Sequence, residues 1–176
     1  MAHVLTGLRL LAVAPAAWAF SRPDRAPAWL LVAVVAVAIA TDVLDGIVAR
    51  RTGVASARGM LFDHTTDFLF VTSGLTGASL AGLVPALLPV LIVAAFSQYV
   101  LDSYFLHRQR QLRMSFLGRW NGILYFVPLV MITIAALRVP GLGELARTLV
   151  RPFAVLLMVS TVASILDRAV APLRTR

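Results

Sequence analysis

Four aspartates stand inside two strongly apolar stretches, and no other feature of the sequence constrains the fold as much. Asp42 and Asp45 lie near the end of one stretch, and Asp63 and Asp67 lie near the start of the next. They make up half of the eight acidic residues in the chain. A carboxylate buried in or near a membrane costs several kcal/mol unless it is paired or bound to a metal. We therefore expect a cationic partner at these side chains, most simply a pair of divalent metal ions.

The spacing of the aspartates predicts that they meet. Asp42 and Asp45 are three residues apart, and Asp63 and Asp67 are four apart, so each pair shares one face of a helix. Two such helices packed face to face aim four carboxylates into one small volume. Oxygen ligands of this kind suit magnesium, manganese or calcium. The absence of cysteine and the presence of only three histidines count against a structural zinc site.

The composition indicates an integral membrane protein. Of the 176 residues, 60% are hydrophobic and only 14% are charged, and the mean hydropathy is +0.87, whereas soluble domains are about a quarter charged. We interpret residues 1–176 as a single membrane domain. The net charge is +8, and all 16 basic residues are arginines. In a membrane protein this charge favours anionic lipid headgroups and phosphorylated substrates as partners, and no nucleic-acid motif is present.

The fold class expected is all-α, with six transmembrane helices. Each apolar stretch is close to the length that crosses a bilayer, about 20 residues. The first stretch lacks a basic leading segment and a cleavage site of the Ala-x-Ala kind, so we interpret it as a retained helix and not as a signal peptide. The six expected helices are Val4–Phe20, Ala28–Ala49, Gly59–Leu80, Pro85–Leu106, Trp120–Leu137 and Pro152–Leu166.

The arginines predict the orientation of these helices. Six spans put both termini on one side, and 11 of the 16 arginines fall on that side against five on the other. The positive-inside rule then places both termini and the four aspartates at the cytoplasmic face of the inner (cell) membrane. The 11 are Arg9, Arg50, Arg51, Arg58, Arg108, Arg110, Arg113, Arg119, Arg168, Arg174 and Arg176.

The aspartates belong to a longer pattern that resembles the signature of the CDP-alcohol phosphatidyltransferase family. That signature is D-x2-D-G-x2-A-R-x8-G-x3-D-x3-D, and all of its fixed positions match with the same spacing. Eight positions at fixed spacing make a specific signal, although the signature covers only residues 42–67. The matching residues are Asp42, Asp45, Gly46, Ala49, Arg50, Gly59, Asp63 and Asp67.

The resemblance implies a reaction and a site. It implies a membrane enzyme that transfers a phosphatidyl group from a CDP-linked lipid, CDP-diacylglycerol, to an alcohol and releases CMP. The active site is expected at the cytoplasmic ends of the second and third helices. There the four aspartates bind two divalent metal ions, Mg²⁺ or Mn²⁺, and Asp67 takes the proton from the acceptor hydroxyl as general base. The family also implies a homodimer.

The remaining signature positions suit binding of the nucleotide. Gly46 and Gly59 allow a nucleotide to lie close against a helix, and helix packing is the alternative for both. The guanidinium of Arg50 forms a planar fork suited to a pyrophosphate, and its alternative role is a topology anchor. Ala49 is interpreted as a steric requirement.

His64 departs from the glycerophosphate-using members, many of which carry proline there. An Asp-His pair at this position resembles the choline and ethanolamine phosphotransferases, which use a CDP-amino-alcohol and diacylglycerol. We therefore keep such an enzyme as an alternative. His64 is either an acceptor contact or proton relay, or a hydrogen-bonded histidine at the membrane interface.

A second cluster of arginines bears on the acceptor. Four arginines close in sequence suit a phosphorylated acceptor such as glycerol 3-phosphate better than a neutral alcohol, and a lipid-facing loop is the alternative. Thr6 and Arg9 also resemble a weak Leu-Thr-x-x-Arg pattern of glycerophosphate-type members. The four arginines are Arg108, Arg110, Arg113 and Arg119.

Two further interpretations stay open from the sequence. Small residues gather in the third helix, and Gly118 and Gly122 form a G-x-x-x-G pattern; close helix packing and a dimer face are the two explanations. A divalent-cation transporter is the rival function from another class. A transporter requires its carboxylates near the bilayer midplane, whereas these lie at helix ends beside arginines.

Overall fold

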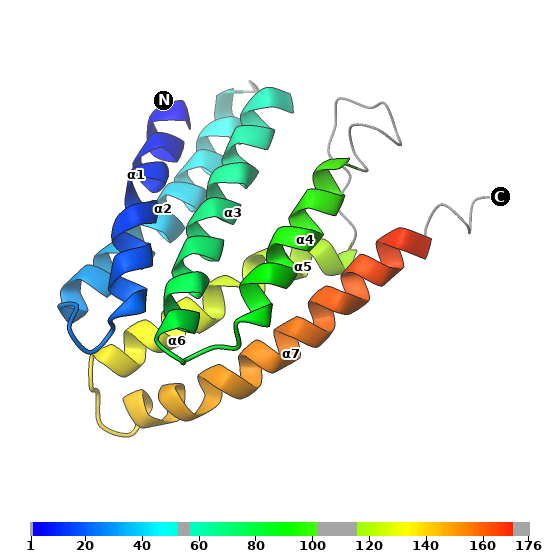
Figure 1. Cartoon of the computed structure of the whole chain (residues 1–176). Coiled ribbons are helices and arrows are strands. Elements are labelled where there is room, and N and C mark those ends of the chain that lie inside the picture. Colours follow the sequence, from blue (N-terminus) through cyan, green and yellow to red (C-terminus); the bar gives the residue numbers. More distant parts are fainter. Residues whose placement is uncertain (1, 53–56, 102–115, 171–176) are drawn as a thin grey trace.

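The structure, a computed structural model, describes residues 2–52, 57–101 and 116–170 (Figure 1). The described residues form helices and turns, with no strand among them, which confirms the all-α prediction. The helices are α1 (Ala2–Ser21), α2 (Ala28–Thr52), α3 (Ala57–Leu80), α4 (Leu87–Leu101), α5 (Phe116–Leu124), α6 (Phe126–Ala136) and α7 (Leu142–Val170).

The helices are arranged so that both halves of the signature lie at one end of the molecule. Helix α1 packs against both α2 and α3, and α7 packs against α4, α5 and α6. The start of α1, the end of α2 and the start of α3 lie together at the top of Figure 1, and the turns that follow α1 and α3 lie at the opposite end. The four aspartates are carried by the upper parts of α2 and α3 and are therefore brought near the start of α1.

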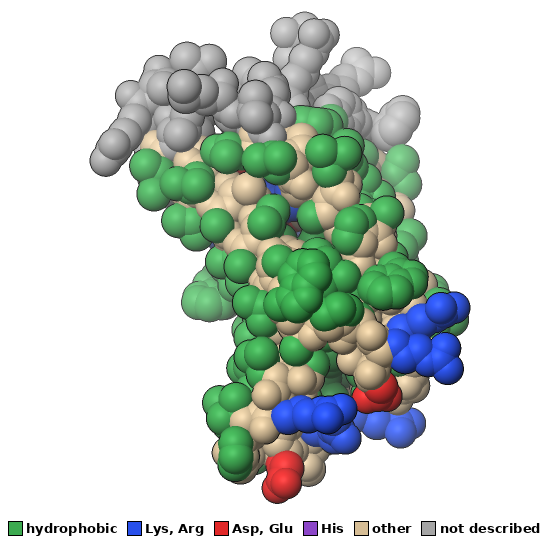
Figure 2. Space-filling model, turned by 90° about the vertical axis from the view of Figure 1, so that its left-hand side faces the viewer, with side chains coloured by type: hydrophobic (Ala, Val, Ile, Leu, Met, Phe, Trp, Pro, Cys, Tyr) green, Lys and Arg blue, Asp and Glu red, His purple; other side chains and the backbone are tan. Residues whose placement is uncertain are grey.

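Length and composition support a membrane-embedded protein. Among the described residues, three helical segments are long and apolar enough to cross a membrane: Ala28–Asp45, Phe116–Ala136 and Leu142–Val170. Leu5–Ser21 and Leu87–Leu101 are apolar but shorter. Apolar side chains cover the middle of the face seen in Figure 2, and charged side chains gather near its lower end. Six spans and their orientation stay predictions.

The fifth predicted helix is interrupted. It begins at Phe116 rather than Trp120, and a turn at Tyr125 separates α5 from α6. Pro128 explains the interruption, because it has no amide hydrogen to donate to the carbonyl of Leu124 and its ring clashes with that carbonyl. The Tyr125 hydroxyl lies 2.8 Å from Thr161 Oγ1 of α7, so the interrupted segment is tied to its neighbour.

The start of the sixth predicted helix, Pro152, was wrong. Helix α7 begins at Leu142 and contains Pro152. The charged side chains before the proline are exposed on the helix surface: Glu144, Arg147 and Arg151. A proline removes one helical hydrogen bond, and the packing of α7 against three other helices outweighs that loss.

The small residues of α3 allow close helix packing. A Cβ atom added at Gly77 would lie 2.5 Å from the carbonyl oxygen of Ala17 and 2.9 Å from the amide nitrogen of Ser21, both in the backbone of α1. At Gly74 an added Cβ would meet the side chain of Leu129 at 3.1 Å. The structure thus favours the packing interpretation for this part of α3.

Gly77→Ala should therefore destabilise the protein. The added methyl group meets backbone atoms that cannot rotate away, and overpacking of this kind costs about 1–3 kcal/mol. For a chain of this length that corresponds to a fall of roughly 3–10 °C in the thermal unfolding midpoint, measured in detergent. Gly7→Ala is the matched control, because no atom of the described residues lies within 4 Å of a Cβ added there. Equal losses in the two variants would contradict the close approach of α1 and α3.

Candidate active site

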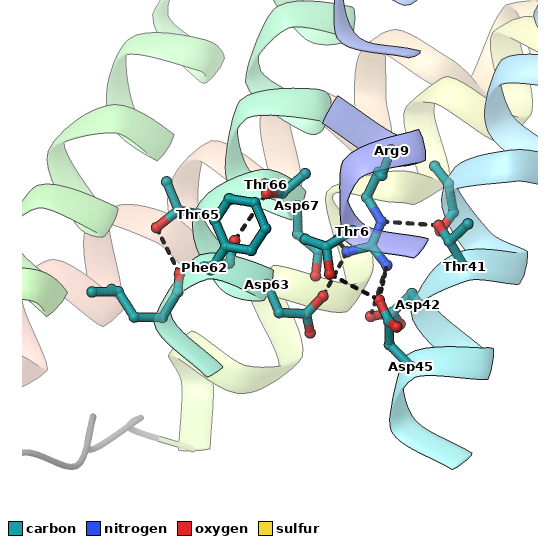
Figure 3. A network of polar contacts seen from close by, with 12 residues as sticks. Thr6, Arg9, Thr41, Asp42, Asp45, Phe62, Asp63, Thr65, Thr66 and Asp67 are labelled. Atoms are coloured by element: carbon teal, nitrogen blue, oxygen red, sulfur yellow. Dashed lines mark hydrogen bonds and ion pairs between the residues drawn. The ribbon is translucent and has the colours of Figure 1, made fainter. Parts of the chain in front are cut away.

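The four aspartates of the signature meet around a single arginine (Figure 3). Asp42 and Asp45 come from α2, and Asp63 and Asp67 come from α3. Arg9 enters from α1 with a fully buried side chain, and its guanidinium lies within ion-pair distance of all four carboxylates. We call the four aspartates the acidic centre. Their convergence is what the i+3 and i+4 spacing predicted.

The guanidinium contacts the two helices unequally. Its Nη1 donates to Asp63 Oδ1 at 3.0 Å and to Asp67 Oδ1 of α3. Its Nη2 lies 3.6 Å from Asp45 Oδ2 and 3.9 Å from Asp42 Oδ1 of α2. The contacts to α3 are therefore charge-assisted hydrogen bonds, whereas those to α2 are longer ion pairs.

Two threonines fix the position of these groups. Arg9 Nε donates to Thr41 Oγ1 at 3.1 Å, and that hydroxyl donates in turn to the carbonyl oxygen of Val37 at 2.7 Å. The Thr6 hydroxyl donates to Asp45 Oδ2 at 3.1 Å. Helix α1 thus supplies a cation and a hydrogen-bond donor to a site whose carboxylates all come from α2 and α3.

The acidic centre fits divalent metal ions. Among the described residues, four carboxylates and one guanidinium leave a formal charge of −3, from −4 and +1. Asp45 Oδ1 is buried and has no hydrogen-bond partner among the described residues, so it is open to a further cation. Ligand atoms of Asp63, His64 and Asp67 all lie within 4.8 Å of one another, close enough for one ion. The donor set is dominated by hard oxygens, as Mg²⁺ and Mn²⁺ prefer.

A cavity of about 470 Å³ adjoins the acidic centre. Asp42, His64 and Asp67 line it, together with Arg119 of α5 and Arg168 of α7. Much of the remaining wall is apolar and aromatic, and includes Phe68, Phe96, Ile92 and Ile123. The cavity thus combines carboxylates, arginines and an apolar wall, as a site for a charged lipid requires.

Helices α4, α5 and α7 form the part of the cavity wall away from the signature. The guanidinium of Arg168 lies 5.2 Å from the ring centroid of Tyr99, and Gln98 Nε2 donates to the carbonyl oxygen of Ile165 at 3.2 Å. Gly118 and Gly122 also line the cavity, and no atom lies within 4 Å of a Cβ added at Gly122. Among the described residues, this glycine therefore borders open space instead of a packed helix.

The structure places the other predicted site residues as follows. Gly46, Ala49 and Arg50 lie in the last part of α2, but their side chains fall outside the described part of the structure. Gly59 lies in the first turns of α3 and is half-buried. His64 is half-buried and Arg119 is exposed, and both line the cavity. The other three predicted acceptor residues, Arg108, Arg110 and Arg113, lie outside the described residues.

Sequence reasoning underused Arg9. In the sequence, Arg9 bears only on topology and on a weak N-terminal pattern, whereas the structure places it at the middle of the acidic centre. One signal was available. An arginine in an otherwise apolar helix requires a negatively charged partner. Half of the acidic residues of this chain are the four aspartates of the signature, so these were the partners to expect for Arg9.

Asp63→Asn should weaken metal binding strongly. The change removes one negative charge from the acidic centre and replaces the 3.0 Å hydrogen bond from Arg9 to a carboxylate by one to a neutral acceptor. We expect Mn²⁺ affinity, followed by electron paramagnetic resonance on the purified protein, to fall about tenfold or more, since charged contacts are worth roughly 1.5–3 kcal/mol. Asp24→Asn removes an exposed charge in the turn after α1, at the opposite end of the molecule, and is the control. Unchanged Mn²⁺ affinity in Asp63→Asn would argue against the metal site.

Comparison with known proteins agrees with this geometry. A cardiolipin synthase (CMP-forming) from Streptomyces coelicolor is 27% identical over 139 residues, which cover 74% of this chain. The chain matches only 64% of the length of that relative. No solved structure matches the chain.

The family itself is shown by a longer match. Residues 1–166 match the model of the CDP-alcohol phosphatidyltransferase family, so the match includes the signature, Arg9 and most of α7. The family is described by transfer from CDP-alcohols, which counts against the transporter alternative. With the eight signature positions present and their four carboxylates gathered at one site, the chain belongs to the CDP-alcohol phosphatidyltransferase family.

Proposed function

We propose that this enzyme transfers a phosphatidyl group from CDP-diacylglycerol to the hydroxyl of a phosphorylated glycerol and releases CMP. One observation carries the proposal: the same cavity is lined by Asp42 and Asp67 of the acidic centre and by Arg119 and Arg168. Carboxylates suit metal ions bound to a pyrophosphate, and arginines suit a second phosphate. A substrate pair with two separate phosphate groups matches both features.

The bond changes follow from the donor. The acceptor hydroxyl oxygen attacks the phosphorus that carries diacylglycerol, the phosphoanhydride bond breaks, and CMP leaves with the bridging oxygen. Asp42, Asp45, Asp63 and Asp67 would hold two divalent ions, Mg²⁺ or Mn²⁺, which would supply positive charge to the pyrophosphate and the leaving oxygen. Gly46, Ala49, Arg50 and Gly59 are proposed to hold the nucleotide close to the helix ends.

Asp67 is proposed as the general base. It lines the cavity that the acceptor would enter, and its Oδ1 accepts a hydrogen bond from Arg9. That contact holds the carboxylate of Asp67 at the boundary between the acidic centre and the cavity. The proton of the acceptor hydroxyl would pass to this carboxylate as the new bond to phosphorus forms. His64 also lines the cavity and is proposed as an acceptor contact.

Two acceptors carry the glycerol phosphate group. Glycerol 3-phosphate is the soluble form and is suggested by the run of arginines near Arg108. Phosphatidylglycerol is the lipid form, and its use would produce cardiolipin and CMP. The apolar wall of the cavity and the similarity to a CMP-forming cardiolipin synthase favour phosphatidylglycerol. The arginines in the cavity and the similarity to that synthase also favour both acceptors over the neutral diacylglycerol that a choline- or ethanolamine-type reaction would use.

The membrane context remains part of the proposal. We infer that the enzyme is a multi-pass protein of the inner (cell) membrane with both termini cytoplasmic, since the arginine distribution favours that orientation. The acidic centre would then face the compartment where the polar part of a CDP-linked donor is found. A homodimer is proposed from the family resemblance.

Purified enzyme given CDP-diacylglycerol should release CMP only when a phosphorylated glycerol is present. Glycerol 3-phosphate, phosphatidylglycerol, inositol and serine form the panel, and a separate reaction supplies CDP-choline with diacylglycerol. Arg119→Gln should raise the KM for the acceptor about ten- to a hundredfold while changing the KM for the donor little, because one charged hydrogen bond is lost. Arg151→Gln, on the exposed surface of α7, is the control. CMP release only with inositol or serine as the acceptor, or only from CDP-choline with diacylglycerol, would contradict the proposed acceptor.

Asp67→Asn should separate donor binding from transfer. Deprotonation of the acceptor belongs to the transition state, so CMP release should fall by at least about a hundredfold, while binding of CDP-diacylglycerol persists with a modest loss. Both quantities are measured on the same preparation, in saturating Mn²⁺. Near-normal turnover would remove the assignment of Asp67 as base.

A further inference from the structure

We propose that Arg9 is a positioning residue whose guanidinium serves as a built-in counter-cation of the acidic centre. In the metal-free protein it holds the carboxylates of α2 and α3 together, and it gives up part of its contacts when divalent ions bind. The second half of this inference rests on the proposed metal binding. The first half rests on the contacts of Arg9 alone.

The contacts of Arg9 divide into firm and replaceable ones. Nη1 is hydrogen-bonded to both carboxylates of α3, and Nε is hydrogen-bonded to Thr41. Nη2 is buried and faces Asp45 and Asp42 at 3.6 and 3.9 Å without a hydrogen bond to any described residue. Since Asp45 Oδ1 is also unpartnered, the side of the guanidinium toward α2 is where another cation can enter at least cost.

Burial keeps Arg9 at the site. Its side chain has no exposed surface, and α1 packs closely against α3 at Gly77. The guanidinium therefore cannot turn into solvent when metal ions arrive, so its charge remains part of the site in both states. A permanent positive charge limits the repulsion among the carboxylates and sets how much charge incoming ions must neutralise.

Removing the charge of Arg9 should destabilise the protein in a way that metal ions can reverse, whereas a loss of packing contacts would not respond to metal ions. Without Arg9 the four carboxylates of the metal-free protein have no positively charged partner among the described residues, and uncompensated charge at the buried Asp45 and the half-buried Asp63 and Asp67 is destabilising. Divalent ions can supply the missing charge. By the thermodynamic cycle that links folding and binding, a variant rescued by metal must bind that metal more tightly than the wild type does.

Arg9→Gln is the central test, measured in EDTA and in saturating Mn²⁺. We expect its unfolding midpoint in EDTA to fall by roughly 10 °C and to recover largely in Mn²⁺, so the rise caused by Mn²⁺ exceeds that of the wild type. Mn²⁺ should bind the variant about tenfold more tightly by electron paramagnetic resonance. Arg147→Gln, which removes an exposed arginine of α7, should change neither quantity. The variant is expressed and purified in Mn²⁺, so that its folding does not depend on Arg9, and the metal is removed with EDTA only before the measurement.

A second variant separates charge from packing. Arg9→Gln with Asp63→Asn removes one positive and one negative charge, and it should recover part of the stability lost in EDTA. Equal losses of Arg9→Gln in EDTA and in Mn²⁺, or no recovery in the double variant, would overturn the counter-cation role. If the wild type shows no response to Mn²⁺, the proposed metal site fails, while recovery in the double variant still supports the role of Arg9.

Discussion

The arrangement of the first three helices depends on a buried ionic contact between Arg9 and four aspartates. A guanidinium with no exposed surface must have partners, and carboxylates at the ends of apolar helices need a cation. Each requirement satisfies the other only if α1 lies against both α2 and α3. Helices α1 and α3 also approach closely at their other ends, because the missing side chain of Gly77 lets the two backbones meet. The site and the packing of α1 are therefore a single structural unit.

The second half of the chain supplies the space beside that unit. Pro128 interrupts the helical segment that begins at Phe116, and the turn at Tyr125 is tied to Thr161 of α7. Helices α4, α5 and α7 together line a cavity that opens onto Asp67. The apolar wall of that cavity is built from several helices, and Arg119 and Arg168 come from α5 and α7, so the proposed acceptor site depends on the assembled fold rather than on the signature.

The sequence predicted local relations better than distant ones. The spacing of the aspartates fixed which carboxylates share a helix face, and their number in apolar surroundings required them to meet. Helix bounds near prolines were harder to predict. Pro128 interrupts a helical segment, whereas Pro152 lies inside α7, where the packing of α7 against its neighbours outweighs the local cost of the proline. The partnership of Arg9 with Asp67 spans 58 residues. No periodicity within a single helix reports such a contact, and only the demand that a buried charge be paired pointed toward it.

The position of Arg9 also explains why the acidic centre suits an enzyme and not a pathway for ions. A translocation site must release its cation, and a fixed guanidinium hydrogen-bonded to two of the carboxylates leaves a permanent positive charge on the route. In a transferase the same charge is useful. It holds the carboxylates of two helices at fixed separation before the substrate arrives, so that less reorganisation is needed when the pyrophosphate enters with its metal ions. The buried guanidinium that joins α1 to α2 and α3 would thus also prepare the site for the proposed phosphoryl transfer.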